Sequence, residues 1–104
     1  MSEIVSVYAI FADAEEAARI GRDMIERRLA ACVNILAPCQ SIYLWHDAVE
    51  EATEVPAIFK TTAGRADELM IAIGDAHSYE APAIVLWPIA ASDERYRQWI
   101  SSLD

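Results

Sequence analysis

The hairpin predicted between Leu29 and Thr62 constrains the fold more than any other part of the chain. Two runs rich in Val, Ile, Tyr, Phe, Trp and Thr predict strands over about Ala31–Trp45 and Val49–Thr61. The His46-Asp47 pair between them suits a tight turn, because Asp tolerates the left-handed backbone that such turns need. Strands usually have about five or six residues, so these two leave more edge and apolar surface than one small chain can cover. We therefore expect subunits to pair through their sheets.

The regions outside the hairpin are predicted to form two strands and three helices. In chain order they are a strand over Ile4–Ala12, a helix from an Asp13 cap to about Leu29, a helix over Ala63–Ala76, a strand over Ala83–Ile89 and a helix capped by Ser92 or Asp93. Glu16 completes a capping box with Asp13, and Thr61 or Thr62 is the expected cap of the second helix.

This order of elements predicts an α+β fold in one domain over residues 1–104. Strand, helix, two hairpin strands, helix and strand form the split β-α-β, ferredoxin-like arrangement, here followed by a C-terminal helix. Two helices are expected on one face of a four-stranded antiparallel sheet. The strands are apolar on both faces, so the second face is expected to meet a partner.

Two prolines and two cysteines modify the hairpin. Pro38 marks a bend in the first strand, and Pro56 predicts an edge or a bulge because proline cannot donate to the ladder. Cys32 and Cys39 lie seven residues apart. In one straight strand that separation places them roughly 20 Å apart on opposite faces. A disulfide between them is not expected unless Pro38 bends the strand sharply.

The charge balance restricts the partners of the chain. Seventeen acidic and eight basic residues give a formal net charge of −9, which repels nucleic acid and anionic membranes. The apolar run near the N-terminus has no basic region before it, and no apolar run reaches the ~20 residues of a membrane span. We expect a cytoplasmic protein with neither nucleic acid nor membrane as a partner.

No familiar catalytic motif is present, so we do not expect an enzyme. An enzyme that uses His77 as a general base, aided by Tyr79 or Glu80, is the weakest of the functional hypotheses. Cys32 and His77 are the candidate metal ligands, since thiolate and imidazole suit transition metals. Glu80 lies close enough in sequence to join His77. Equally, Cys32 is typical of a small buried side chain, and His77 of a residue that complements a helix C-terminus.

Several polar residues have more than one interpretation. Lys60 suits a salt bridge with Glu80, an anion site or a plain surface charge, and Trp45 and Tyr79 suit the walls of a pocket. Glu50, Glu51 and Glu54 indicate a solvated acidic patch near the hairpin turn, in preference to a metal site.

Five blocks of the sequence, in order, resemble the CutA divalent-cation tolerance family. They are RLAACVNIL, SIYLWHDAVEEATEV, FKT, HSYEAPAI and the tail from Tyr96 to Ile100. The resemblance covers nearly the whole chain and implies a ferredoxin-like subunit in a tight homotrimer, similar to PII-type signalling proteins. It implies functional positions near clefts between subunits, at Cys32, Asn34, Lys60, His77, Tyr79, Glu80 and Pro82.

The chain departs from the family pattern at several of these blocks. The family usually has Pro at position 78 and Glu at position 83, where this chain has Ser78 and Ala83. It usually has Gly at 47, commonly Gly at 39, and an aliphatic residue at 56, where this chain has Asp47, Cys39 and Pro56. Loss of the acid at Ala83 weakens a carboxylate-rich metal site, and Cys39 adds a soft ligand or a contact between subunits.

Two functions follow as expectations. The first is a homotrimer that binds divalent or transition metal ions, copper above all, through Cys32, His77 and Glu80, with no cofactor required for folding. The alternative is a PII-like regulatory trimer that binds a small anionic ligand in a cleft formed by Asn34, Trp45, Lys60 and Tyr79.

Overall fold

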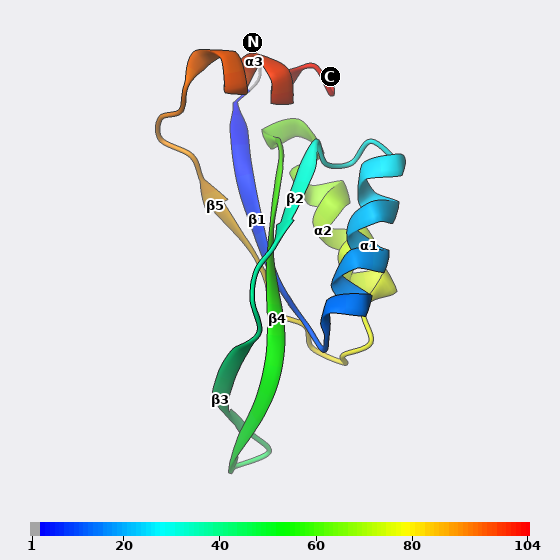
Figure 1. Cartoon of the computed structure of the whole chain (residues 1–104), viewed down its shortest axis with the longest axis vertical. Coiled ribbons are helices and arrows are strands. Elements are labelled where there is room, and N and C mark those ends of the chain that lie inside the picture. Colours follow the sequence, from blue (N-terminus) through cyan, green and yellow to red (C-terminus); the bar gives the residue numbers. More distant parts are fainter. Residues whose placement is uncertain (1–2) are drawn as a thin grey trace.

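The computed structural model describes residues 3–104, which form one antiparallel sheet and three α-helices (Figure 1). In chain order the elements are β1 (Ile4–Phe11), α1 (Ala14–Glu26), β2 (Cys32–Ile35), β3 (Cys39–Trp45), β4 (Ala48–Thr62), the 3-10 turn η1 (Ala63–Arg65), α2 (Ala66–Ala76), β5 (Ile84–Pro88) and α3 (Glu94–Ser101). No helix within this part of the chain combines the length and apolar character needed to cross a membrane.

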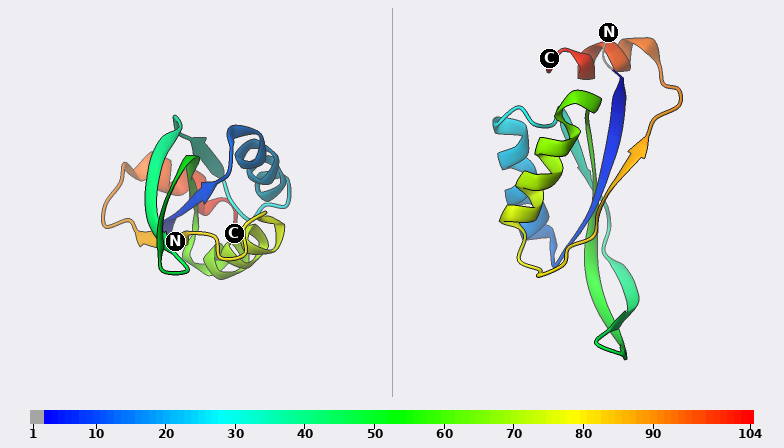
Figure 2. Two further views of the ribbon diagram at one scale, coloured as in Figure 1. Left: turned by 90° about the horizontal axis from the view of Figure 1, so that it is seen from below. Right: turned by 180° about the vertical axis from the view of Figure 1, so that it is seen from behind.

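The sheet has five strands over the described residues, not the four predicted. Its order is β2-β4-β1-β5, and β3 pairs with the other half of β4. The difference arises because the first hairpin strand is divided into β2 and β3. The helices α1 and α2 cover one face of the sheet, and α3 lies across one end of it (Figures 1 and 2).

A bulge divides β2 from β3 and shifts the register against β4. On one side of the break Ile35 pairs with Ala57, and on the other Cys39 pairs with Glu54, so three residues face two. The Leu36 N–H donates to the Pro56 carbonyl at 2.9 Å. Because the nitrogen and the carbonyl of one strand residue point to the same side, the Pro56 nitrogen, which has no hydrogen, also faces the break. The bend predicted at Pro38 and the bulge predicted near Pro56 are therefore confirmed.

The hairpin continues beyond the helices as an arm that consists of β3 and the first half of β4 (Figure 1). His46 and Asp47 both have positive φ, 49° and 66°, and Trp45 pairs with Ala48 across them. The predicted two-residue turn is thus confirmed. Apolar side chains on the arm are solvent-exposed in the single subunit, with Ile42 at 66%, Leu44 at 68% and Val49 at 73%.

The core lies between the sheet and the two helices. The β1 residues Val7, Ala9 and Phe11 alternate with residues of the opposite, open face of the sheet, and Phe59 of β4 joins them. Ile20 is among the residues that α1 buries against this layer. Because the helices cover this face alone, Tyr8 and Ile10 on the open face stay half-buried in the single subunit.

The predicted helix starts are right at two helices and wrong at the third. Asp13 accepts a hydrogen bond from the Glu16 N–H at 2.8 Å, and Asp93 caps α3. Neither threonine caps α2, because η1 intervenes between the strand and the helix. Thr61 instead donates its hydroxyl to the Leu29 carbonyl at 2.7 Å and is fully buried. It ties the connection between α1 and β2 to β4.

Replacing Thr61 with Val is expected to lower the free energy of unfolding by about 1–3 kcal/mol, because the shape is kept while the buried Leu29 carbonyl loses its donor. The measurement is urea denaturation at one fixed subunit concentration. Thr53→Val is the control, because Thr53 lies exposed on the same strand, and a change within about 0.5 kcal/mol is expected. Equal losses in the two variants would contradict the role given to the Thr61 hydroxyl.

Candidate functional site

The residues predicted for the site fall into two separate groups. Cys32 pairs directly with Lys60, and Asn34 with Ile58, so these side chains share the open face of the sheet. The Cys32 Sγ lies 3.5 Å from the Tyr96 hydroxyl of α3. Burial, together with this contact, raises the pKa of Tyr96 to about 12. Cys32, Asn34 and Lys60 thus form one group near α3.

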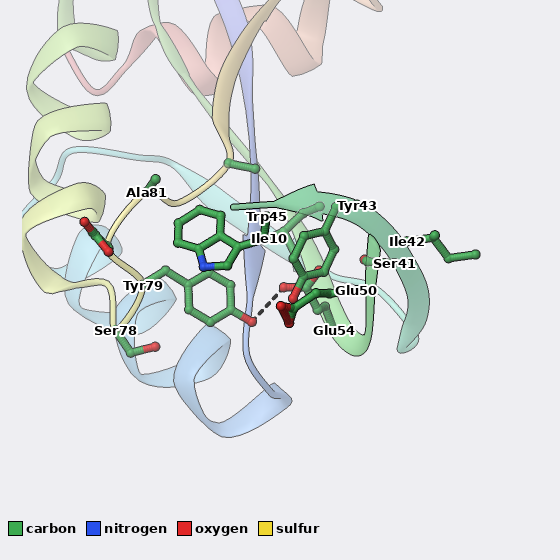
Figure 3. A pocket seen from close by; sticks show the side chains of 12 residues that line it. Ile10, Ser41, Ile42, Tyr43, Trp45, Glu50, Glu54, Ser78, Tyr79 and Ala81 are labelled. Carbon is green, nitrogen blue, oxygen red and sulfur yellow. Dashed lines mark hydrogen bonds between the residues drawn. The ribbon is translucent and has the colours of Figure 1, made fainter. Parts of the chain in front are cut away.

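The second group lines a cleft at the other end of the sheet, between the arm and the segment that joins α2 to β5 (Figure 3). Its volume is about 740 Å³. It includes Trp45, Tyr79 and Glu80 of the predicted residues but neither Asn34 nor Lys60. The full lining is Ile10, Ser41, Ile42, Tyr43, Trp45, Glu50, Glu54, Ser78, Tyr79, Glu80, Ala81 and Ala83.

A short hydrogen bond crosses this cleft. The Tyr79 hydroxyl donates to Glu54 Oε2 at 2.6 Å (Figure 3). Burial, and then the bond to the Glu54 carboxylate and its charge, raise the pKa of Tyr79 far above its ordinary value. Glu54 is only 7% exposed, so its assignment to a solvated patch was wrong. The bond joins the arm to the α2–β5 segment.

The His77 side chain lies under this segment with both ring nitrogens occupied. Nδ1 accepts the Tyr79 N–H at 3.0 Å, which assigns the proton to Nε2, and Nε2 donates to the Ile10 carbonyl at 2.7 Å. The ring is 9% exposed and stacks on Phe11 with centroids 5.0 Å apart. In this arrangement His77 supports the rim of the cleft and has no free lone pair for a metal ion.

Glu16 fastens the same segment to the start of α1. Its Oε1 accepts the Ala12 N–H at 3.1 Å and its Oε2 the Ser78 N–H at 3.0 Å. Burial alone favours the protonated acid, but the hydrogen bonds from Ser78 and Ala12 outweigh it and lower the pKa of Glu16. The N–H that Ser78 supplies would be missing from a proline.

The predicted metal ligands do not meet within one subunit. His77 stacks on Phe11 on the helix-covered face, whereas Cys32 lies on the open face and five positions further along β4, roughly 16 Å. Over residues 3–104 no group of three His, Cys, Asp or Glu side chains is placed to hold a metal ion. Both cysteines are free, and of the three interpretations of Lys60 the salt bridge with Glu80 does not form between the described residues.

Comparison with known proteins agrees with this fold. The family model described as CutA1 divalent ion tolerance protein matches residues 5–103. The divalent-cation tolerance protein CutA of Thermus thermophilus is 39% identical over 101 residues, which cover 96% of this chain and 95% of that protein. The Protein CutA homolog of Danio rerio is 38% identical over 84% of this chain, which spans only 59% of the fish protein.

A solved structure has nearly the same fold as this chain. That of the periplasmic divalent cation tolerance protein CutA from Archaeoglobus fulgidus superposes with a TM-score of 0.92 at 34% identity, covering 96% of this chain and 97% of that one. Fold and site together define a small mixed α/β protein with an antiparallel sheet, a projecting hairpin arm and an acidic cleft. The chain belongs to the CutA1 divalent ion tolerance protein family.

The sequence reasoning missed two functional carboxylates, Glu16 and Glu54. Glu16 was recognised only as part of a capping box, although a capping glutamate has a second oxygen free to bind elsewhere. Glu54 lies on the same face of β4 as Pro56, Ile58 and Lys60. The period of two along a strand therefore indicates that Glu54 and Glu51 lie on opposite faces. Its partner Tyr79 follows a helix and was not predictable from spacing.

Replacing Glu16 with Gln is expected to reduce the fall in the free energy of unfolding as the pH is lowered from 7 to 3. The folded pKa lies below the unfolded value of about 4.5, so the ionised carboxylate stabilises the fold above that pH and this contribution is lost as pH falls through the folded pKa. The measurement is the free energy of unfolding at pH 7 and pH 3. Glu15→Gln, exposed in the same helical turn, is the control. A wild-type pH slope in Glu16→Gln would refute this account.

Proposed function

We propose that the chain assembles into a homotrimer that binds divalent and transition metal ions, copper among them, and thereby contributes to cation tolerance. The observation that carries the proposal is the match of residues 5–103 to the CutA1 divalent ion tolerance family. The sheet order, with two helices on one face, supports a ferredoxin-like and PII-like architecture for the subunit.

The exposed apolar surface of the single subunit supports the assembly. The arm exposes Ile42, Leu44 and Val49, and the open face of the sheet exposes Trp87 at 46%, where its ring stacks on Tyr8. Leu44 and Val49 are direct cross-strand partners, so they form a continuous exposed apolar patch on the arm, and such a patch is normally covered by a partner. Because the arm and the open face belong to the same chain, copies of the chain can cover one another's surfaces.

The assembled protein is expected to have a mass of about 34.5 kDa, three times the 11.5 kDa subunit. Leu44→Glu places a charge on the arm and is expected to shift the mass measured by light scattering toward that of the monomer and to lower the melting temperature. Ile71→Glu on α2 is the control, since Ile71 is 65% exposed against 68% for Leu44. A stable wild-type monomer of 11.5 kDa would refute the assembly.

The placement of the metal-binding side chains agrees best with metal sites that are completed between subunits. Within the described part of one chain the donors are dispersed, and the nitrogens of His77 are occupied. We therefore propose two metal ligands, the thiol of Cys32 on the open face and the carboxylate of Glu80 at the cleft. We propose that the protein acts by binding in the cytoplasm and catalyses no reaction.

Calorimetric titration of zinc and copper into metal-free protein tests the metal proposal. Saturable binding is expected in the wild type, under reducing and non-reducing conditions, with affinity at least about tenfold weaker in Cys32→Ser because a soft ligand is lost. Cys39→Ser is the matched control, since Cys39 is the other free thiol and lies on the arm. Absence of saturable binding, or equal loss in both variants, would contradict the assigned donor.

The regulatory alternative loses its main support, because the cleft lacks the cation that an anionic ligand needs. Lys60 lies on the open face beside Cys32, and the twelve residues that line the cleft include three glutamates and no Lys or Arg. An anion would be repelled there. We therefore do not propose an anionic ligand for this cleft.

A further inference from the structure

The arm joins the rest of the subunit at an interruption of the sheet. The bulge between β2 and β3 breaks the ladder, and the first pair of the arm beyond the break is Cys39 with Glu54. A bulge bends its strand and leaves the ladder locally disrupted, so backbone pairing holds the direction of the arm only weakly at this point. Glu54 therefore lies at the root of the arm.

A small change of direction at this root is amplified along the arm. The ladder continues from Glu54 to Ala48 beside the turn, six positions or roughly 20 Å along β4. Leu44 and Val49, the apolar pair that we expect to contact another copy of the chain, lie near the far end. The direction of the arm at its root therefore decides whether this pair reaches the surface that covers it.

One side-chain hydrogen bond restrains the root of the arm against the body of the subunit. The Tyr79 hydroxyl, on the segment between α2 and β5, donates to Glu54 Oε2 at 2.6 Å (Figure 3). A hydrogen bond of this length to a carboxylate is among the stronger kinds in proteins. The other side-chain hydrogen bonds that the arm forms among residues 3–104 stay within the arm.

The segment that carries Tyr79 is itself held in place by two buried side chains. The Ser78 N–H donates to Glu16 Oε2 at 3.0 Å, and the Tyr79 N–H donates to His77 Nδ1 at 3.0 Å. His77 in turn donates to the Ile10 carbonyl, so the segment is tied to both α1 and β1. The Tyr79 hydroxyl therefore holds the root of the arm from a fixed position.

The ionisable side chains that the subunit buries are concentrated at this segment. Among residues 3–104 they are Glu16, Glu54 and His77, with 4%, 7% and 9% of their surface exposed. All three form hydrogen bonds with Ser78 or Tyr79. Buried polar groups add little net stability compared with apolar side chains of similar size, but a fully bonded network favours one arrangement over others. Such a network is suited to fixing a direction.

We propose that the hydrogen bond between Tyr79 and Glu54 is a latch that sets the direction of the arm for docking on a second copy of the chain. This inference rests on the homotrimer proposed above. An arm that is already held loses little freedom when it docks, whereas an arm that bends freely at the bulge loses that freedom on association and binds more weakly. Tyr79 is thus a positioning residue, which acts on the assembly through the arm.

Light scattering over a dilution series tests the latch by measuring the subunit concentration at which half of the assembly has dissociated. Tyr79→Phe removes only the hydroxyl and is expected to raise this concentration by about tenfold or more, because the root of the arm loses its restraint. Tyr43→Phe is the matched control. It removes the same hydroxyl from a tyrosine of the arm that forms no hydrogen bond among the described residues, and a change within about twofold is expected.

A second variant shows whether the Tyr79 hydroxyl acts through Glu54. Glu54→Gln keeps the shape of the side chain and an oxygen that accepts from Tyr79, so the half-dissociation concentration is expected to rise only by about threefold to fivefold. Glu54→Gln added to Tyr79→Phe is expected to cause less than about a further twofold rise, since both residues act through one bond. Glu51→Gln, exposed on the same strand, is the control for the lost charge and is expected to resemble the wild type.

Thr61→Val separates the latch from a general loss of stability. This variant also removes a buried hydrogen bond, but one that lies in the body of the subunit. It is expected to leave the half-dissociation concentration within about twofold of the wild type, while far-ultraviolet circular dichroism shows folded subunits at each dilution. An equal rise in Thr61→Val and Tyr79→Phe would overturn the latch, because any lost bond would then dissociate the assembly.

Two further results would also overturn the latch. They are an equal rise in Tyr43→Phe and Tyr79→Phe, and losses that simply add when Tyr79→Phe and Glu54→Gln are combined. A wild type that is monomeric at every concentration would overturn the homotrimer itself. A trimeric wild type with an unchanged Tyr79→Phe variant would overturn the latch alone, so failures of the two proposals are distinguishable.

Discussion

The backbone pairing of β4 is the interaction on which the rest of the structure depends. This single strand of 15 residues pairs with β1 and β2 at one end and with β3 at the other. Its C-terminal half lies in the core, whereas its N-terminal half forms the arm and supplies Glu50 and Glu54 to the cleft. The position of the cleft is therefore set by the same ladder that holds the core strands together, and Pro56 marks the point where the two halves meet.

Much of this fold was predictable from local pattern. The turn at His46-Asp47, the Asp13 cap and the break near Pro38 follow from backbone preferences of the residues concerned, which act over a few positions. The number of strands was not predictable, because the division of β2 from β3 depends on register against β4. The start of α2 was missed because the 3-10 turn η1 precedes it, and the Thr61 hydroxyl bonds the distant Leu29 carbonyl.

The site was predictable only in part, since sequence spacing says little about which face of a sheet a residue occupies. Trp45, Tyr79 and Glu80 do meet in the cleft. Cys32 and Lys60 also meet, but on the open face near α3. The prediction of His77 as a metal ligand rests on the chemistry of imidazole, whereas in the single subunit both ring nitrogens bond backbone groups. Such bonds join segments far apart in the chain and leave no local sequence signal.

The bond between Glu16 and Ser78 has a consequence for how this sequence can change over evolution. The Ser78 N–H is one of the donors that keep a buried carboxylate ionised at position 16. A proline at position 78 has no N–H and would leave that oxygen unpaired unless residue 16 had changed first. The two positions are thus epistatic, and the order in which substitutions occur decides which intermediates fold well.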